Sequence, residues 1–290
     1  MLYLITHTTT YEYSASVSVC QNEARLTPRE RKRQTNLRHD IQIDPEPAHM
    51  RHRVDFFGNP VVYFCVQQPH EELRVTALSE VQINSVELPD FKTTQPWELA
   101  RQAIVNDRTP QGLMAYQFAF DSSYVKSGPD LGAYADVSFE PGRPLLECVA
   151  ELNHRIYDEF EYDPKATNVS TPVREVLENK RGVCQDFAHL MLCALRSKGL
   201  AARYVSGYLR TNPPEGKPRL QGADASHAWV SVYAPGHGWV DFDPTNDTNP
   251  QDQHVTLAWG RDFGDVSPIK GVILGGGHHT IKVAVDVVPV

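Results

Sequence analysis

The hydrophobic pattern of the chain changes near Pro96, and this change constrains the fold more than any other feature of the sequence. Before it, segments such as YEYSASVSVC (11–20) and LRVTALSEVQIN (73–84) alternate apolar with polar residues and are rich in β-branched and aromatic side chains. Such alternation is typical of strands with one buried face. The turn FFGNP (56–60) separates two of these runs, as a hairpin connection does. Residues 1–92 are therefore predicted to form an antiparallel β domain, most simply a sandwich.

Beyond this point the apolar residues follow helical spacing. The segments QPWELARQAIVND (95–107) and PQGLMAYQFAF (110–120) each have a proline at or near their start, where proline suits the first helical turn. In PLLECVAELNHRIYDEF (144–160), apolar residues at i, i+4, i+7 and i+11 from Leu145 form one face of a helix. The first two segments place a helical connecting region at 93–143.

A further helix is predicted from Cys184 to Ser197, with Gly199 as its stop. Segments with strand character follow it: LAARYVSGYL (200–209), SHAWVSVYA (226–234), GWVDFDPT (238–245) and TIKVAVDVVPV (280–290). Helices followed by strands at hairpin spacing favour an α+β fold over a doubly wound sheet. We therefore predict a second domain over 93–290, with a core at 144–290 in which a helix packs on an antiparallel β-sheet.

The composition is that of an ordinary globular protein, with 41% hydrophobic and 22% charged residues in 290 positions. The formal net charge of -8 argues against nucleic acid as a partner. Basic residues cluster between Arg25 and Arg38. They are predicted to form a solvated strand or turn face, with a polyanion-binding patch as the alternative, because no aromatic residues are interleaved to stack bases.

The N-terminal residues 1–13 lack both a basic region and a long apolar run, so no signal peptide is expected. No segment approaches about 18 uninterrupted apolar residues, so no membrane span is expected either. The five cysteines, at positions 20, 65, 148, 184 and 193, are widely spread and never form a C-x-x-C pair. We therefore expect a reduced, cytoplasmic protein with free thiols, no cysteine-based zinc site and no cofactor.

Cys184 stands at the start of a predicted helix, in the sequence RGVCQDFAHLML (181–192). A helix N-terminus offers unpaired N–H groups and the positive end of the helix dipole, which together favour a thiolate, the nucleophilic form of cysteine. The same N–H groups could hold an oxyanion that develops on a substrate carbonyl. Cys193 lies in the middle of the helix, where a small buried hydrophobe is expected. By position alone, Cys184 is equally well a reactive thiol or a packing residue.

A reactive cysteine needs a base, and His227 is a better candidate than the nearer His189. Five residues along a helix correspond to a rotation of about 500°, so the side chains of His189 and Cys184 point roughly 140° apart. His189 is therefore predicted to be structural. In SHAWVSVY, strand alternation places His227, Trp229 and Ser231 on one face.

The next predicted strand carries two acids, Asp241 and Asp243, on a shared face. Asp243 stands at the strand end, just before Pro244. A carboxylate that binds one imidazole nitrogen fixes the tautomer and leaves the other nitrogen to exchange a proton with a thiol. An aspartate before Pro-Thr-Asn is equally typical of a turn. Cys184, His227 and Asp243 together match the nucleophile, base and orienting residue that cysteine acyl transfer requires.

With these residues assembled, the chain resembles the transglutaminase-like superfamily of papain-fold cysteine enzymes. More narrowly, it is similar to bacterial transglutaminase-like proteins with an N-terminal β domain. The segments that carry the resemblance are TPVREVLENKRGVCQDFAHLMLCALRSKGLAARYVSGYL (171–209), SHAWVSVYAPGHGWVDFDPTN (226–246) and HVTLAWGRDFGDVSPIKGV (254–272). The resemblance implies a catalytic Cys–His–Asp triad at Cys184, His227 and Asp243.

The implied chemistry is cysteine-dependent acyl transfer on amide or peptide bonds through a thioester, with hydrolysis by a cysteine protease or amidase expected first. Transamidation of protein glutamine is the alternative acceptor chemistry, and a non-catalytic peptide-binding or assembly module is the alternative class. The expected partner is a peptide or protein amide substrate, with no nucleic acid and no membrane.

Other residues of the second domain are predicted to be structural. His254 and Gly260–Asp262 look like family features that shape the cleft floor or tie the C-terminal segment to the core. His278 and His279 follow three glycines and are predicted to belong to a polar turn rather than to a metal site.

Overall fold

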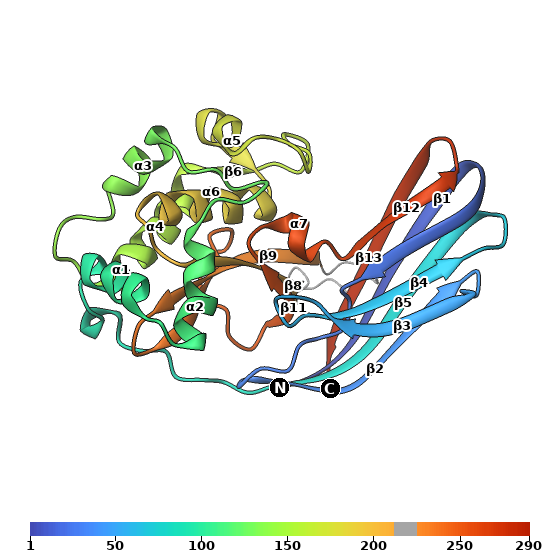
Figure 1. The fold of residues 1–290 in the computed structure, drawn as a ribbon, viewed down its shortest axis with the longest axis horizontal. Helices are drawn as coiled ribbons and strands as arrows, with labels where there is room; N and C mark the ends of the chain where they lie inside the picture. Colours follow the sequence, from blue (N-terminus) through green and yellow to red (C-terminus); the bar gives the residue numbers. More distant parts are fainter. Residues whose placement is uncertain (212–224) are drawn as a thin grey trace, which may run out of the picture.

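The computed structural model describes residues 1–211 and 225–290. The molecule has two lobes, one built on a long antiparallel sheet and the other built from helices around a shorter antiparallel sheet (Figure 1). This arrangement confirms the predicted α+β fold with a β-rich N-terminal region. Within the described ranges, no helix combines the length and the apolar character needed to cross a membrane.

The first lobe is a β structure in which β1 pairs with most of the other strands. Its strands are β1 (Leu2–Ala24), β2 (Gln34–Asp44), β3 (His49–Val54), β4 (Pro60–Val66), β5 (His70–Ile83), β12 (Ile269–Gly275) and β13 (His279–Pro289). The strand order is β2-β5-β1-β4-β3, and β12 and β13 both pair with β1. Along β1, Tyr3 and Ile5 are buried whereas Leu4 between them is exposed. The alternation that predicted these strands therefore reflects one face packed on a core.

The last two strands join the first lobe although they come from the end of the chain. Val17–Ala24 of β1 pairs with β12, and Tyr3–Tyr13 of β1 pairs with β13. The two chain ends consequently lie together (Figure 1), and the Val290 N–H donates to the Leu2 carbonyl. The sequence predicts that residues 269–290 belong to the second domain. In the structure, the strands that these residues form pair instead with β1 of the first lobe. Alternation identifies a strand, but it does not identify the sheet that the strand joins.

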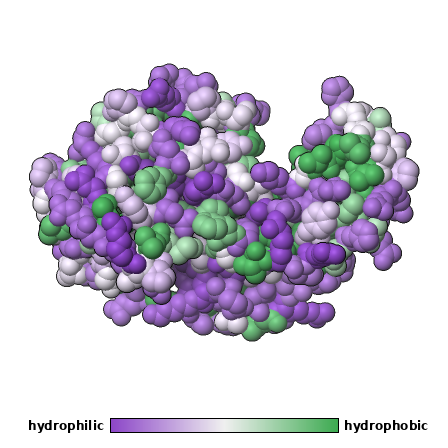
Figure 2. All heavy atoms as spheres, in the orientation of Figure 1, coloured by the Kyte–Doolittle hydropathy of each residue, from purple (hydrophilic) through white to green (hydrophobic). Residues whose placement is uncertain are grey.

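Strands β12 and β13 also expose apolar side chains. Val272, Leu274, Ile281 and Val283 are each more than half exposed. Figure 2 shows an apolar area on the first lobe, beside the recess that separates the two lobes. The recess is therefore bordered on one side by apolar surface.

The second lobe contains the helices. They are α1 (Trp97–Asn106), α2 (Pro110–Tyr116), α3 (Pro129–Asp136), α4 (Leu145–Glu159), α5 (Val173–Asn179), α6 (Cys184–Ser197) and α7 (Phe263–Val266), with 3-10 turns η1 (Phe91–Thr93) and η2 (Gln117–Ala119). The segments predicted to be helical correspond to α1, α2, α4 and α6. The short helices α3 and α5 were not predicted, because so few turns carry little periodic signal.

The sheet of the second lobe has the order β10-β9-β8-β11 and is antiparallel throughout. Its strands are β8 (Ala202–Leu209), β9 (Ala225–Ala234), β10 (Gly238–Phe242) and β11 (His254–Gly260), and a two-residue parallel pair, β6 (Glu161–Tyr162) and β7 (Arg181–Gly182), lies before α6. Val230 and Val232 of β9 pack in one core with the buried face of α6. Strand alternation places His227 and Trp229 on the other face, as predicted.

That other face is covered by residues 25–34 of the first lobe. Arg31 and Arg33 both bind Asp241 of β10, with nitrogen–oxygen distances of 3.0 and 3.3 Å. The Gln34 side-chain amide donates to the Thr256 carbonyl and accepts from the Thr256 N–H, each at 2.8 Å. These contacts fix the first lobe on the sheet of the second.

The prediction of a solvated basic face is therefore wrong for part of the cluster. Arg25, Arg29 and Arg33 are buried. Arg25 binds Asp55 at 3.2 Å, and the Arg29 guanidinium lies over the Trp259 ring, 3.5 Å from its centroid. Local sequence could not show this, because the aromatic and acidic partners Trp259 and Asp241 are far away along the chain.

Candidate active site

Helix α6 begins at Cys184, and the residues at its start are closely packed. The Asp186 carboxylate accepts hydrogen bonds from the Val183 N–H at 2.9 Å and from the Thr167 hydroxyl at 2.6 Å. A Cβ atom on Gly182 would lie only 2.8 Å from the Asp186 carboxylate, so glycine is needed at this approach. Asp186 therefore caps the helix, and the first-turn N–H groups around Cys184 remain without helical acceptors.

Cys184 differs from the other cysteines in its exposure. It is partly exposed, whereas the other four cysteines are buried, and all five are free thiols in the described chain. Burial raises the pKa of Cys193 to about 12 and that of Cys148 to about 11. Only Cys184 thus combines access from solvent with a helix N-terminus, as a reactive thiol requires.

His227 and Asp243 form a buried pair beside this cysteine. Their closest atoms, Nε2 of His227 and Oδ2 of Asp243, are 2.8 Å apart, and the side chains are 5% and 0% exposed. Burial alone would lower the pKa of His227, but the Asp243 carboxylate raises it above the ordinary value, and Cys184 adds to the rise. Burial would likewise raise the pKa of Asp243, but His227 lowers it below its usual range. The pair therefore favours an imidazolium beside a carboxylate.

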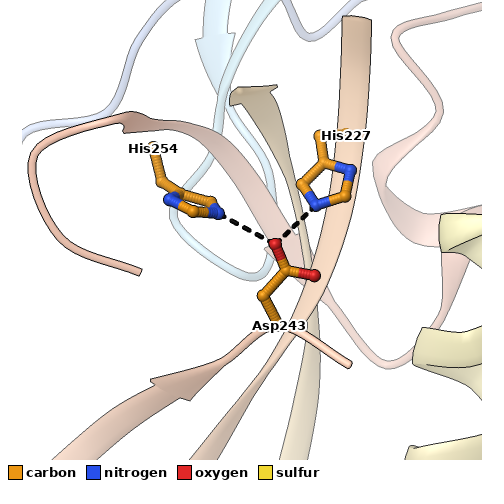
Figure 3. A group of neighbouring side chains, drawn as sticks. All are labelled: His227, Asp243 and His254. Carbon is orange, nitrogen blue, oxygen red and sulfur yellow. Dashed lines mark hydrogen bonds and ion pairs between the residues drawn. The ribbon is translucent and has the colours of Figure 1, made fainter. Parts of the chain in front are cut away.

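Cys184 lies close enough to His227 to contribute to that shift. Because Asp243 binds Nε2, the other ring nitrogen, Nδ1, is left for the thiol; it points away from Asp243 (Figure 3). The structure thus brings together Cys184, His227 and Asp243, the three residues that the sequence predicts to act together.

Asp243 also forms the turn that its sequence context suggested. Its Oδ1 accepts the Thr245 N–H at 3.0 Å, and its own N–H donates to the Thr248 carbonyl at 2.8 Å. The same residue therefore fixes its own backbone with one carboxylate oxygen and binds His227 with the other. The turn interpretation of Asp243 is therefore confirmed, and the contact with His227 is the one that an orienting role requires.

His254, for which the sequence predicts only a structural role, is a further member of the cluster. Its Nε2 lies 3.0 Å from the same Asp243 Oδ2 that binds His227 (Figure 3). His254 is buried, and its Nδ1 has no hydrogen-bond partner within the described residues. Burial lowers the pKa of His254, and the nearby His227 lowers it further although Asp243 opposes the change. His254 is therefore held neutral and donates Nε2–H to Asp243.

A sequence signal for His254 exists, although it is indirect. Strand β8 separates β9 from β11, and Gly207 of β8 is opposite His227. A Cβ atom on Gly207 would lie 2.5 Å from the Trp229 ring. Without that Cβ, Trp229 can lie across β8 and contact His254, with ring centroids 5.2 Å apart. A glycine in the middle of a strand marks such a close approach.

His227, Asp243 and His254 could supply metal ligands by residue type, because their ligand atoms lie within 4.8 Å of one another. However, a hydrogen-bond donor, the side-chain amide of Asn246, lies beside two of these ligand atoms. The side-chain nitrogen of Asn246 lies 2.7 Å from Asp243 Oδ2 and 3.3 Å from His227 Nε2. The group therefore has the geometry of a hydrogen-bonded cluster around one carboxylate oxygen, which we call the histidine cluster.

The other candidate residues have structural surroundings. The His189 ring is buried, accepts the Phe263 N–H through Nε2 at 3.2 Å and stacks on Tyr124. Asp262 accepts the N–H groups of Tyr124 and Gly264, each at 2.9 Å, and so fixes the start of α7. These contacts agree with the structural roles predicted for both residues. His278 and His279 are exposed, and whereas His278 lies in the turn before β13, His279 is the first residue of that strand.

Comparisons with known proteins agree with this arrangement. The family profile described as "Bacterial transglutaminase-like N-terminal region" matches residues 3–82, and the one described as "Transglutaminase-like superfamily" matches residues 134–244. The uncharacterized protein Rv2569c of Mycobacterium tuberculosis is 42% identical over 296 residues, which cover 99% of this chain and 92% of that protein. The two family regions correspond to the β-rich N-terminal part and to the part that holds Cys184, His227 and Asp243.

Two further proteins share parts of this likeness. A protein-glutamine gamma-glutamyltransferase of Pseudomonas aeruginosa is 33% identical over 212 residues, which cover 67% of this chain but only 31% of that protein. The solved structure of a proposed cysteine protease from Cytophaga hutchinsonii has a TM-score of 0.77 at 22% identity, and the match covers 100% of this chain and 91% of that one. At that identity the second likeness concerns the fold alone.

Proposed function

The chain belongs to the transglutaminase-like superfamily, and on this premise we propose that it transfers acyl groups from amide or peptide bonds through Cys184. His227 is the acid–base residue, and Asp243 orients it. The observation that carries the proposal is the position of Cys184, the one partly exposed cysteine, at a helix N-terminus beside the buried His227–Asp243 pair. A thiol, an imidazole and a carboxylate in this order are what nucleophilic catalysis by cysteine requires.

The reaction follows from this geometry. The Cys184 thiolate attacks the amide carbonyl carbon, and the first-turn N–H groups of α6 stabilise the oxyanion. The C–N bond then breaks as the His227 imidazolium gives its proton to the departing amine, which leaves a thioester on Cys184. His227 next removes a proton from the acceptor, which attacks the thioester and releases the acyl product. The thiolate and the imidazolium are thereby restored.

His254 has a positioning role in this scheme. It donates to Asp243 from the side opposite His227 and remains neutral, so it holds the carboxylate without competing for the proton. Charge-assisted hydrogen bonds of this kind restrict the carboxylate to one orientation. His227 then keeps its Nδ1 directed away from Asp243, where the thiol can exchange a proton with it.

Water is the acceptor in the first form of the proposal, which makes the protein a cysteine protease or amidase acting on a peptide or protein substrate. A second candidate is transamidation, in which an amine resolves the thioester. It is favoured by the likeness to the Pseudomonas aeruginosa protein-glutamine gamma-glutamyltransferase. Exclusion of water from the cleft decides between the two acceptors. The free thiols support a reducing compartment, and we propose the cytoplasm.

The test compares Cys184→Ala with Cys193→Ala, a matched change in the same helix. Release of amines from an unfolded protein substrate measures hydrolysis, and incorporation of a fluorescent primary amine measures transamidation. We expect Cys184→Ala to abolish both activities. Cys193 is buried away from the site, so Cys193→Ala should retain both activities. Full turnover by Cys184→Ala would overturn the proposal. The ratio of the two products in the wild type identifies the acceptor.

A further inference from the structure

A second site lies at the junction of the two lobes, away from the histidine cluster. It is a cavity of about 470 Å³, and its walls are largely aromatic. Phe57 of the first lobe, Met114 of α2, Phe118, Tyr233, Trp239 and Trp259 contribute to the walls. Arg203 of β8 is the only charged residue among the described residues that line it. Apolar walls with one well-placed polar group are typical of sites for small organic ligands.

Arg203 is a buried cation that lies against two aromatic rings and lacks a hydrogen-bond acceptor at Nε among the described residues. The residue is 5% exposed, and its guanidinium lies 3.7 Å from the centroid of the Trp259 ring and 4.1 Å from that of Trp239. Its Nε is buried and has no hydrogen-bond partner in the part of the chain that the structure describes. A buried charge is normally paired with an acceptor, because leaving its donors unsatisfied is costly.

The Asp241 carboxylate raises the pKa of Arg203 against the larger effect of burial, but it forms no hydrogen bond with Arg203 Nε. Asp241 is already engaged by Arg31 and Arg33 from the first lobe. Arg29 stacks on Trp259 as well, and it donates to the carbonyl of Phe57 and to the side chain of Asn59. The guanidinium groups of Arg31, Arg33 and Arg203 therefore share the single Asp241 carboxylate, and the one that forms no ion pair with it, Arg203, lines the cavity.

We propose that this cavity binds a small carboxylate with a flat apolar body. The carboxylate accepts from the Arg203 guanidinium in the paired geometry that arginine offers to carboxylates. The apolar body packs among Phe118, Trp239 and Trp259. No covalent step is involved, and the inference goes beyond the proposed acyl transfer.

The site is separate from the proposed catalytic residues. Tyr233, which lines the cavity, lies six residues after His227 on β9, and six residues of strand span about 20 Å. A small ligand in the cavity cannot also reach the histidine cluster. Because Phe57 belongs to the first lobe and Tyr233 to the second, a bound ligand contacts both lobes and stabilises the folded chain by mass action.

The experiment is a calorimetric titration of the full chain with phenylacetate, and phenylacetamide is the control with nearly the same shape and no charge. We expect saturable binding of phenylacetate in the millimolar range, as its size allows, and binding of phenylacetamide at least about ten times weaker, as loss of a charge-assisted bond implies. Equal affinity for the two probes, or no saturable binding of phenylacetate, would overturn the proposal.

Two variants give the assignment to Arg203 a separate test. Arg203→Met keeps much of the side-chain volume and removes the charge, so phenylacetate binding is lost while the unfolding temperature is unchanged or higher. A lower unfolding temperature with unchanged phenylacetate affinity would show instead that Arg203 is a structural link between the tryptophans.

The second variant leaves Arg203 in place. Met114 is 46% exposed on α2, so Met114→Trp can fill the mouth of the cavity without disturbing the core. It should abolish phenylacetate binding. Leu113→Trp, on the same helix at an exposed position outside the cavity lining, should not. If both variants bind phenylacetate like the wild type, the ligand site lies elsewhere.

Discussion

Asp241 and Asp243 are both buried carboxylates on one face of a single strand and its end, but Asp241 is bound by arginines and Asp243 by histidines. Burial alone would raise the pKa of Asp241, and Arg31 and Arg33 lower it to about 2. A guanidinium does not give up its proton at any ordinary pH, whereas an imidazole exchanges one near neutrality. The Asp241 end of the face is therefore a permanent ion cluster, and the Asp243 end has the groups that proton exchange requires.

The two carboxylates also differ in what they connect. The arginines that bind Asp241 come from the first lobe, so that contact joins the lobes. The histidines that bind Asp243 come from β9 and β11 of the second lobe, so that contact orders the proposed active site. The identity of the partner, rather than the acid or its burial, separates the structural carboxylate of Asp241 from the proposed catalytic carboxylate of Asp243.

The largest expected difference between the two carboxylates is in activity. Asp243→Asn should lower the rate of amide cleavage by about 10³-fold or more, as loss of the orienting carboxylate does in catalytic triads. Asp241→Asn should leave the rate of the folded protein within about threefold, because it lies outside the proposed chemistry. Steady-state assays on both variants, with the folded fraction checked by circular dichroism, measure this. Equal losses in two folded variants would remove the distinction.

The stability effects should run in the opposite direction. Asp241→Asn should lower the free energy of unfolding by about 3–5 kcal/mol, because Arg31 and Arg33 cannot become neutral and are left as buried unpaired charges. Asp243→Asn should have a smaller effect, because His227 can release its proton when its partner is lost. Urea unfolding of the two variants gives the comparison. A larger destabilisation by Asp243→Asn would contradict this account.

A smaller effect on activity is expected at His254. His254→Phe keeps a ring against Trp229 but removes the donor to Asp243, so kcat/KM should fall by about 10- to 100-fold, the equivalent of one hydrogen bond to a charged group. His254→Gln restores an N–H donor and should recover part of the loss. A purely structural role for His254 would give no recovery with Gln at equal stability.

The smallest effect concerns stability at mildly acidic pH. The pKa of His254 is lowered in the folded chain, so the unfolded chain takes up a proton first as the pH falls below about 6.5. This residue should therefore reduce stability below that pH, by at most about 1.4 kcal/mol per pH unit. His227 acts oppositely, because its pKa is raised in the folded chain: its contribution is fully present below about 6.5 and is lost at alkaline pH.

Comparing wild type with His254→Gln between pH 7 and pH 5.5 isolates the acid effect. As the pH falls, the free energy of unfolding of the wild type should decrease more than that of His254→Gln. The ion pairs of Asp241 with arginine should not change the free energy of unfolding between pH 7 and pH 5.5, because arginine does not titrate in this range. A parallel pH dependence for the two proteins would mean that His254 is not held neutral.

Sequence patterns pointed to the proposed catalytic residues because each one has a local signature. Cys184 follows a glycine at the start of an amphipathic helix, His227 lies on an alternating strand, and Asp243 ends the next strand. The alternation that defined the strands of the first lobe comes from burial of one face, which is also local. These residues and strands can therefore be predicted without knowing which distant parts of the chain contact one another.

The remaining features depend on contacts between distant parts of the chain. The burial of Arg33 requires Asp241, and the role of His254 requires a carboxylate on a strand that is not its neighbour. The pairing of β12 and β13 with β1 brings the last residues of the chain to the first strand. No local pattern encodes which distant partner a charged residue or an edge strand will find.

We propose that His227, held by Asp243, activates Cys184. The most direct test is the pH dependence of Cys184 alkylation by iodoacetamide in the wild type and in His227→Ala, with Asp241→Asn as the control. We predict rapid alkylation below pH 7 in the wild type and in the control, and slow alkylation in His227→Ala. Alkylation that rises only near pH 8.5, where an ordinary thiol ionises, and that is unaffected by His227→Ala would contradict the account.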